Sequence, residues 1–316
     1  MVKIAVAGGS GELAREVLDV LAPSGEHDII ILTRSETLTE SQNPHGLRCV
    51  QVDYSSLDSL TSALRGIHTV LSYLQLIHDP ESKAQKLLID AAVAAGVKRF
   101  APSEYGPRFA GSSMPYNLGK ISSRKYLEEI NSKKKVLEYT LFECGFFMNY
   151  LATPHKTAKH LTPLNFFVDF DQCRAVVIEG HDPIATFTTV QDTVAVVAAS
   201  IKHEGPWPTV GGIQGHRLTF SELIKIGESV RGSPFKIHTV KLEDLKSGKI
   251  TAPWGLERTH PSVSEEDAAR MLLQVLIGGL LSCHEGAWDL SDEWNQLLPE
   301  VNFTKIDKFV DGLWTK

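Results

Sequence analysis

The stretch "KIAVAGGSGELAREVLDVLA" (3–22) decides the fold. It begins with a short apolar run rich in β-forming residues, which indicates a buried strand. Glycines follow this run, and from residue 12 onward the apolar residues recur with the period of a helix. A buried strand, a glycine-rich turn and a helix in this order predict the first βα unit of a parallel sheet.

The glycines of this turn have the spacing of a phosphate-binding loop. They read Gly8-x-x-Gly11-x-x-Ala14. Gly8 permits the tight turn, Gly11 leaves room for a pyrophosphate against the backbone, and Ala14 lets helix and strand pack closely. The phosphates would bind the free amides at the helix N-terminus. The residues expected to hold a dinucleotide here are Gly8, Gly9, Ser10, Gly11, Glu12 and Leu13. The alternative is a glycine-rich turn without a cofactor.

The same alternation continues along the chain. Apolar runs predict strands at 28–34, 47–53, 68–74, 97–103 and 137–144, and helical periodicity predicts helices at 57–66, 81–96 and 116–131. Right-handed βαβ units then give an α/β fold, a doubly wound parallel sheet of the Rossmann type.

The rhythm of the sequence changes after residue 145. Prolines and aromatic residues become frequent, so we expect residues 1–145 to form a dinucleotide-binding domain. Residues 146–316 would mainly form a smaller, discontinuous substrate-binding lobe that ends in helices. The helical stretch 189–202 would pack back on the first sheet, and a late helix is expected over 264–281, opened by Ser264.

Composition excludes several classes of function. The net charge of −6 is spread without long runs, which argues against nucleic acid or an anionic membrane surface as a main partner. The 12 histidines lack metal-site spacing, so we expect no metal. The 4 cysteines are scattered, which is typical of reduced thiols in a cytoplasmic protein. We find no apolar run long enough for a membrane span, and expect a monomer or homodimer that binds a small molecule.

The end of the second predicted strand indicates which dinucleotide binds. NAD sites have an acid there, whereas this chain has Arg34, which can pair with the 2′-phosphate of NADP. Glu36 lies close by, and Arg15 is either a second cation or part of a solvated helix face. Asp53 could accept a hydrogen bond from the adenine or cap the next helix. The expected cofactor is NADP(H).

Four segments together resemble one family. They are "GGSGELA" at the N-terminus, "TR" after the second strand, "VKRFAPSEYG" (97–106) and "YTLFECGFFMNYL" (139–151). They are similar to the NmrA-like and isoflavone-reductase-like proteins, which are atypical short-chain dehydrogenases. The resemblance implies that Lys120, on the helix after the fifth strand, is the catalytic group. Members of the family often lack a tyrosine four residues earlier, but this chain has Tyr116 there, as in ordinary short-chain dehydrogenases.

These residues make a coherent acid/base set. Tyr116 would donate a proton to the oxyanion that develops during hydride transfer. Its ordinary pKa is about 10, so it needs a neighbouring cation. Lys120 lies one helical turn away, and it can also bind the cofactor by holding the nicotinamide ribose. Ser103 would orient the substrate oxygen. If Tyr116 points away, Lys120 alone could serve. The alternative is a packed tyrosine and a solvated lysine on an ordinary amphipathic helix.

An aromatic segment follows the sixth predicted strand, where the ends of parallel strands face the cofactor crevice. Its residues are either the wall of an apolar substrate pocket or core packing: Phe146, Phe147, Met148, Asn149 and Tyr150. Of these, Phe147 and Asn149 are the stronger pocket candidates.

The sequence therefore predicts an NADPH-dependent oxidoreductase. Its substrate would be a small apolar, aromatic metabolite that reacts at a carbonyl, an activated alkene or a benzylic ether. The resemblance implies a place in secondary metabolism. Two alternatives stay open: a non-catalytic NADP(H)-sensing regulator of the NmrA type, and a redox-neutral isomerase, epimerase or cyclase on the same fold.

Overall fold

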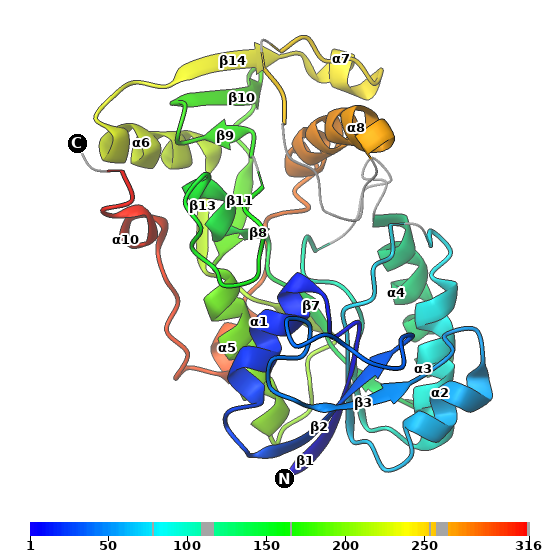
Figure 1. Cartoon of the computed structure of the whole chain (residues 1–316). Coiled ribbons are helices and arrows are strands. Elements are labelled where there is room, and N and C mark those ends of the chain that lie inside the picture. The colour runs from blue at the N-terminus through cyan, green and yellow to red at the C-terminus, as the bar shows by residue number, and fades with distance from the viewer. Residues whose placement is uncertain (78, 109–116, 165, 253, 257–264, 315–316) are drawn as a thin grey trace.

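A computed structural model of the chain describes residues 1–316 apart from 78, 109–116, 165, 253, 257–264 and 315–316 (Figure 1). For residues 265–267 it describes the backbone alone. Tyr116 and Ser264, both singled out by the sequence, lie outside the described residues. No helix in the described part of the chain is both long and apolar enough to cross a bilayer.

A parallel sheet forms the centre of the first part of the chain, as predicted. Its strand order is β3-β2-β1-β4-β5-β6. From β1, strands β2 and β3 are added on one side and strands β4 to β6 on the other, so the order of the strands reverses between β1 and β4. The core strands are buried, so each reads as a continuous apolar run. The strands are β1 (Val2–Ala7), β2 (His27–Thr33), β3 (Arg48–Gln51), β4 (Thr69–Ser72), β5 (Arg99–Ala101) and β6 (Glu138–Tyr139). In such sheets ligands bind beyond the carboxyl ends of the strands, at the point of reversal.

Helices cover both faces of this sheet (Figure 1). One face carries α1 (Glu12–Leu21) and α5 (Val190–Lys202), which pack against each other, so the helix expected at 189–202 lies where it was predicted. The other face carries α2 (Leu57–Ala63), α3 (Lys83–Ala95) and α4 (Leu118–Asn131). The doubly wound α/β fold is therefore confirmed.

The strand expected at 137–144 is wrong in one respect, because the chain changes partners within it. Its first part, β6, pairs with β5, whereas its second part, β7 (Leu141–Glu143), pairs in parallel with β12 (Val210–Gly212). Thr140 stands at the break, where its hydroxyl accepts a hydrogen bond from the indole N–H of Trp294 at 3.3 Å. The periodicity of residues 137–144 cannot show that part of this stretch pairs with a strand that begins at residue 210.

The rest of the chain builds two small sheets around an apolar cluster of its own. One sheet has the order β14-β10-β9 and the other β13-β11-β8. The strands are β8 (Phe146–Phe147), β9 (Val168–Asp169), β10 (Arg174–Ile178), β11 (Ile184–Thr188), β13 (His216–Thr219) and β14 (Lys236–Val240). The helices are the 3₁₀ turn η2 (Met148–Ala152), α6 (Phe220–Arg231), α7 (Leu242–Lys246), α8 (Glu265–His284), α9 (Glu293–Leu297) and α10 (Ile306–Val310). The division of the chain at residue 145 stays a prediction.

Candidate active site

The glycine turn between β1 and α1 is built closely against the neighbouring strand end. Gly8 has φ +75°, and a Cβ at this position would lie 2.7 Å from the carbonyl oxygen of Tyr73. Gly11 is the N-cap of α1, and its amide donates to the Gly8 carbonyl at 3.0 Å. Ala14 is fully buried. The turn thus has the conformation that the sequence motif requires, with the N-terminus of α1 beside the point where the strand order reverses.

A cavity of about 660 Å³ opens at this edge of the sheet. One side is formed by Ser10 to Arg15 of the glycine turn and by the loops after β4 and β5. The opposite side is apolar and comes from the later part of the chain, and its main side chains are Phe146, Phe147, Phe166, Phe167, Met271, Leu272, Val275 and Trp288. A volume and lining of this kind suit a small, largely apolar ligand.

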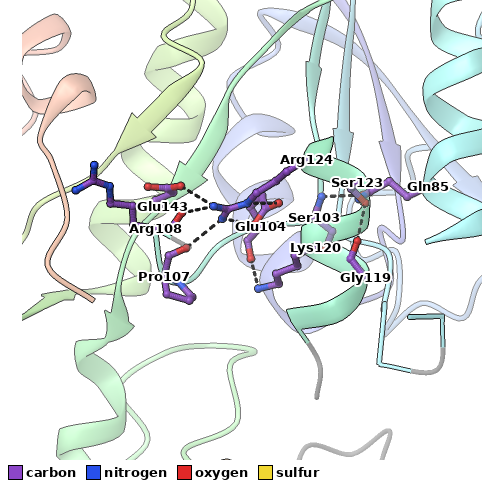
Figure 2. A network of polar contacts seen from close by, with 10 residues as sticks. All are labelled: Gln85, Ser103, Glu104, Pro107, Arg108, Gly119, Lys120, Ser123, Arg124 and Glu143. Atoms are coloured by element: carbon purple, nitrogen blue, oxygen red, sulfur yellow. Dashed lines mark hydrogen bonds and ion pairs between the residues drawn. The ribbon is translucent and has the colours of Figure 1, made fainter. Parts of the chain in front are cut away.

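Lys120 reaches this cavity from the first turn of α4 (Figure 2). Its amine Nζ donates to the backbone carbonyl of Glu104 at 2.5 Å. Burial lowers the pKa of Lys120 below its ordinary value, although the Glu104 carboxylate opposes this change. A partly desolvated amine held at a cavity wall is suited to proton transfer.

A buried network of charges lies directly behind Lys120 (Figure 2). Arg124 forms two hydrogen bonds with the carboxylate of Glu104, at 3.0 and 2.7 Å, and an ion pair with Glu143 at 3.1 Å. The two carboxylate side chains are each only 1% exposed. Our reading of the sequence missed this network. A signal was present, because Arg124 stands four residues after Lys120 and thus on the same helix face.

Ser103 lies at the cavity wall, as expected of a residue that follows β5. Its backbone N–H donates to the side-chain oxygen of Gln85 at 2.8 Å, which fixes the start of the loop. Gln85 is itself buried and donates to Ser123 on α4 at 2.6 Å (Figure 2). The structure therefore brings Ser103 and Lys120 to one cavity.

The aromatic segment after β7 divides between cavity and core. Phe146, Phe147 and Tyr150 line the cavity, and their contact with a substrate stays a prediction. Met148 and Asn149 are absent from its described lining, and this differs from the prediction. The amide oxygen of Asn149 instead accepts from the backbone N–H of Val190 at 2.8 Å. The chain enters the turn η2 here, so consecutive side chains point in different directions.

Two tyrosines that sequence reasoning did not single out also line the cavity. Tyr73 follows β4 and Tyr105 follows β5, and their rings stack with centroids 4.9 Å apart. Both hydroxyls are buried, and burial raises the pKa of both tyrosines. Their positions after adjacent parallel strands were the signal that could have identified them.

A second, more open cavity of about 1040 Å³ contains the residues predicted to select the cofactor. Arg34 and Asp53 both line it, and both are exposed. Asp53 accepts from the amide and hydroxyl of Ser55, which lower its pKa, whereas Ser56 caps α2. Of the two roles considered for Asp53, helix capping is therefore wrong.

Of the two alternatives for Arg15, a second cation or part of a solvated helix face, the structure does not fit the solvated face. Arg15 is half-buried and lines the main cavity, and its guanidinium donates to the Ser41 carbonyl at 3.2 Å.

A segment from the later part of the chain is fastened to α1 beside the glycine turn. The backbone N–H of Thr162 donates to the Glu12 carboxylate, and that of Leu161 donates to Glu16, each at 3.0 Å. Leu161, Thr162 and Leu164 all line the main cavity. Glu12 therefore binds protein backbone here, in addition to lying where a dinucleotide was expected.

Sequence comparison assigns the family. The model of the NmrA-like family matches residues 2–272. The chain belongs to the NmrA-like family. One relative, "Oxidoreductase swnN" of Metarhizium robertsii, is 29% identical to this chain. The alignment covers 100% of this chain and 98% of the relative. "Oxidoreductase BOA1" of Botryotinia fuckeliana is 31% identical over 73% of this chain and 77% of its own.

Solved structures share the fold of this NmrA-like protein along its whole length. AtPrR2 with NADP+ and (+)pinoresinol has a TM-score of 0.71 at 18% identity and covers 99% of both chains. The NADPH-dependent quinone oxidoreductase QOR2 of Escherichia coli has a TM-score of 0.68 at 21% identity, over 99% of this chain and 100% of its own. At these identities the likeness establishes the fold.

Proposed function

We propose that this protein is an NADPH-dependent reductase of a small, apolar, aromatic metabolite, which reacts at a carbonyl, an activated alkene or a benzylic ether. The observation that carries the proposal is the Lys120 amine, which shares one cavity with the glycine turn and with a wall of aromatic side chains. A proton donor, a phosphate-binding turn and an apolar chamber are the parts that such a reduction needs. Relatives named as oxidoreductases support it.

The residues at the glycine turn fit a dinucleotide phosphate. The tight turn at Gly8 leaves no space for a side chain against Tyr73, and the first amides of α1 stand at the cavity. Arg34 is exposed at the second cavity, where it can pair with a 2′-phosphate that a carboxylate would repel. Structures of fold relatives with NADP+ or NADPH support this choice. NADPH supplies the hydride when bound.

Lys120 would act on the substrate oxygen. As an ammonium it stabilises the negative charge that develops there and gives up a proton. Burial lowers the pKa of Lys120, which makes its ammonium form a stronger proton donor. Ser103, which directly precedes Glu104 in the loop that holds the Lys120 amine, would orient the same oxygen, and Tyr116 remains a proposed second proton donor.

The part of the chain after residue 145 would form the substrate side of the site. It supplies the apolar wall, including Phe146, Phe147 and Trp288. These side chains exclude water from the reacting group, which strengthens the effect of the lysine charge. A largely apolar wall also favours aromatic over strongly polar substrates.

The test is consumption of NADPH with a panel of apolar aromatic carbonyl compounds, alkenes and benzylic ethers. Lys120→Met should lower turnover by about a thousandfold while NADPH still binds. Lys125→Met, an exposed lysine on the same helix, is the matched control and should keep full activity. NADPH binding without consumption across the panel would favour the sensor, and product formation without net consumption would favour redox-neutral chemistry.

The cofactor choice has its own test. We expect a lower dissociation constant for NADPH than for NADH, and Arg34→Leu should weaken NADPH binding by about tenfold and leave NADH binding nearly unchanged. A lower constant for NADH in the unmodified protein contradicts the choice of NADPH.

A further inference from the structure

Lys120 is held by a backbone carbonyl. Its Nζ donates to the oxygen of Glu104, at the start of a loop that lines the cavity through Pro107. The loop passes close over the amine, since a Cβ at Gly106 would lie 3.3 Å from Nζ. A backbone carbonyl moves only when its loop moves, so the position of the amine depends on the contacts that fix this loop.

Arg124 fixes it. Its guanidinium binds the Glu104 carboxylate through two atoms, at 3.0 and 2.7 Å, and donates to the Pro107 carbonyl at 3.1 Å and to that of Arg108 (Figure 2). The Arg124 side chain is 14% exposed and that of Glu104 only 1%. Arg124 thus ties both ends of the loop 104–108 to the helix that carries Lys120.

We propose that the Arg124–Glu104 pair positions Lys120 for proton transfer, by holding the loop 104–108 against α4 so that the Glu104 carbonyl directs the amine into the cavity. The inference rests on the proposed function of Lys120 and deepens it. Both partners are positioning residues, because they act on the substrate through Lys120. A guanidinium suits the task, since its planar fork binds a carboxylate and further carbonyls at once, which an ammonium cannot do in the same geometry.

Glu104 and Arg124 also place one negative and one positive charge near Lys120. A double variant can therefore separate the positioning of the amine from the change in its pKa. The charged and titratable groups that act on Lys120 are Glu104, Arg124 and Cys144. Glu104→Gln should lower the pKa of Lys120 and Arg124→Met should raise it. The double variant removes one charge of each sign beside Lys120. Glu143, which also pairs with Arg124, loses that partner too, but burial raises its pKa to about 8, so below that pH it can hold a proton instead of an unpaired charge. The double variant should therefore keep the pKa of Lys120 close to that of the wild type, although the Arg124–Glu104 pair that holds the loop 104–108 is lost.

The experiment uses the full chain and two readouts. The first is turnover with NADPH and the best substrate of the panel. The second needs no substrate: Lys120 is carbamylated with cyanate across a pH series, and the modification of this one residue is quantified by mass spectrometry. Cyanate is small and reacts with the neutral amine, so the pH series reports the pKa of Lys120 and the rate reports its access.

We expect the double variant Glu104→Gln/Arg124→Met to lose about a hundredfold in kcat, because a misplacement of about 1 Å has effects of this size. KM for NADPH should stay within about threefold. Carbamylation should become about tenfold faster with little change in pKa, since the amine is released from under the loop. Arg124→Lys should fall between the wild type and the double variant, and it covers the case in which Arg124→Met does not fold.

Arg99→Met is the matched control, because Arg99 also joins a partly buried carboxylate and two carbonyls but lies at the far end of the sheet. It should lose stability and keep kcat. A double variant with wild-type kcat and wild-type carbamylation overturns the inference. If wild-type protein turns over nothing in the panel, the proposed function fails by itself, and an unchanged carbamylation rate would then still overturn the positioning role.

Discussion

Two arginines hold the two ends of strand β5, and they use the same chemistry. At the amino end Arg99 binds Glu138 at 3.0 Å and the carbonyls of His203 and Gly205 at 2.8 and 2.7 Å. At the carboxyl end Arg124 binds Glu104, Glu143 and two carbonyls.

The difference lies in what each arginine holds. The segment under Arg99 leads from α5 toward β12 and contributes nothing to the described lining of the main cavity, whereas the loop under Arg124 is part of that lining. The direction of the parallel strands thus decides which of two similar clusters can act on a ligand. The following predictions contrast the two ends of the sheet.

Gly145→Ala should have the largest effect. Gly145 follows β7 at the carboxyl end with φ +71°, and a Cβ there would lie 2.1 Å from the Thr186 carbonyl oxygen. Backbone strain and the forced displacement together should cost about 4 kcal/mol of unfolding free energy. Urea unfolding of the purified protein measures this, and a loss below about 1 kcal/mol would show that the junction yields easily.

Arg99→Met should cost about 3 kcal/mol of unfolding free energy, because it removes the less exposed of the two cations that bind the partly buried Glu138 and frees two carbonyls. The side chains of Arg99 and Glu138 are only 12% and 20% exposed. Denaturant unfolding gives the cost, and turnover per folded molecule should not change. A large drop in kcat would contradict the division of roles between the two ends.

Glu143→Gln should change how stability depends on pH. Burial raises the pKa of Glu143 to about 8, although Arg124 opposes this, so the folded state holds the proton more tightly than the unfolded state does. Wild-type stability should therefore fall as pH rises from about 5 to 8, by about 2 kcal/mol after allowance for relaxation around the charge. The variant should lack this fall when thermal or urea unfolding is measured across the range.

Glu138 at the amino end provides the opposite sign for comparison. Burial raises its pKa, but hydrogen bonds from the Trp207 amide and from Lys135 outweigh this and lower the pKa overall. Its contribution to stability is present above its unfolded pKa and is lost as pH falls. If Glu143→Gln and Glu138→Gln change the pH dependence of unfolding free energy in the same way, the opposite signs expected for these two carboxylates are wrong.

Gly96→Ala should have the smallest effect. Gly96 is the C-cap of α3 and lies near the amino ends of the sheet strands, with φ +74°. A Cβ at this position would meet nothing within 4 Å. Only the left-handed backbone is unfavourable, so we expect a loss of about 1 kcal/mol in urea unfolding. The gap between Gly96→Ala and Gly145→Ala then measures how tightly the carboxyl end is packed.

The sequence predicted the fold well because its signals are local. The run 3–8, the glycine turn and the alternation of strands and helices each depend on neighbouring residues. The placement of Ser103, Lys120 and Phe146 at one cavity followed from the rule that ligands bind at the carboxyl ends of parallel strands.

What escaped prediction depends on contacts between distant parts of the chain. The break at Thr140 requires β12, and the apolar wall from α8 requires a helix more than a hundred residues beyond Phe146. Asn149 was assigned to the pocket because local pattern cannot tell which side a short 3₁₀ turn presents. Glu104 and Arg124 belong to neighbouring elements, but their pairing depends on the path of the intervening loop.

The segment fastened to α1 by Glu12 and Glu16 makes one wall of the cavity common to both halves of the molecule. Leu161 and Thr162 line the cavity on one side and bind the first helix on the other. This wall of the chamber therefore rests on the helix whose amino end forms the glycine turn, so the two sides of the cavity meet at α1.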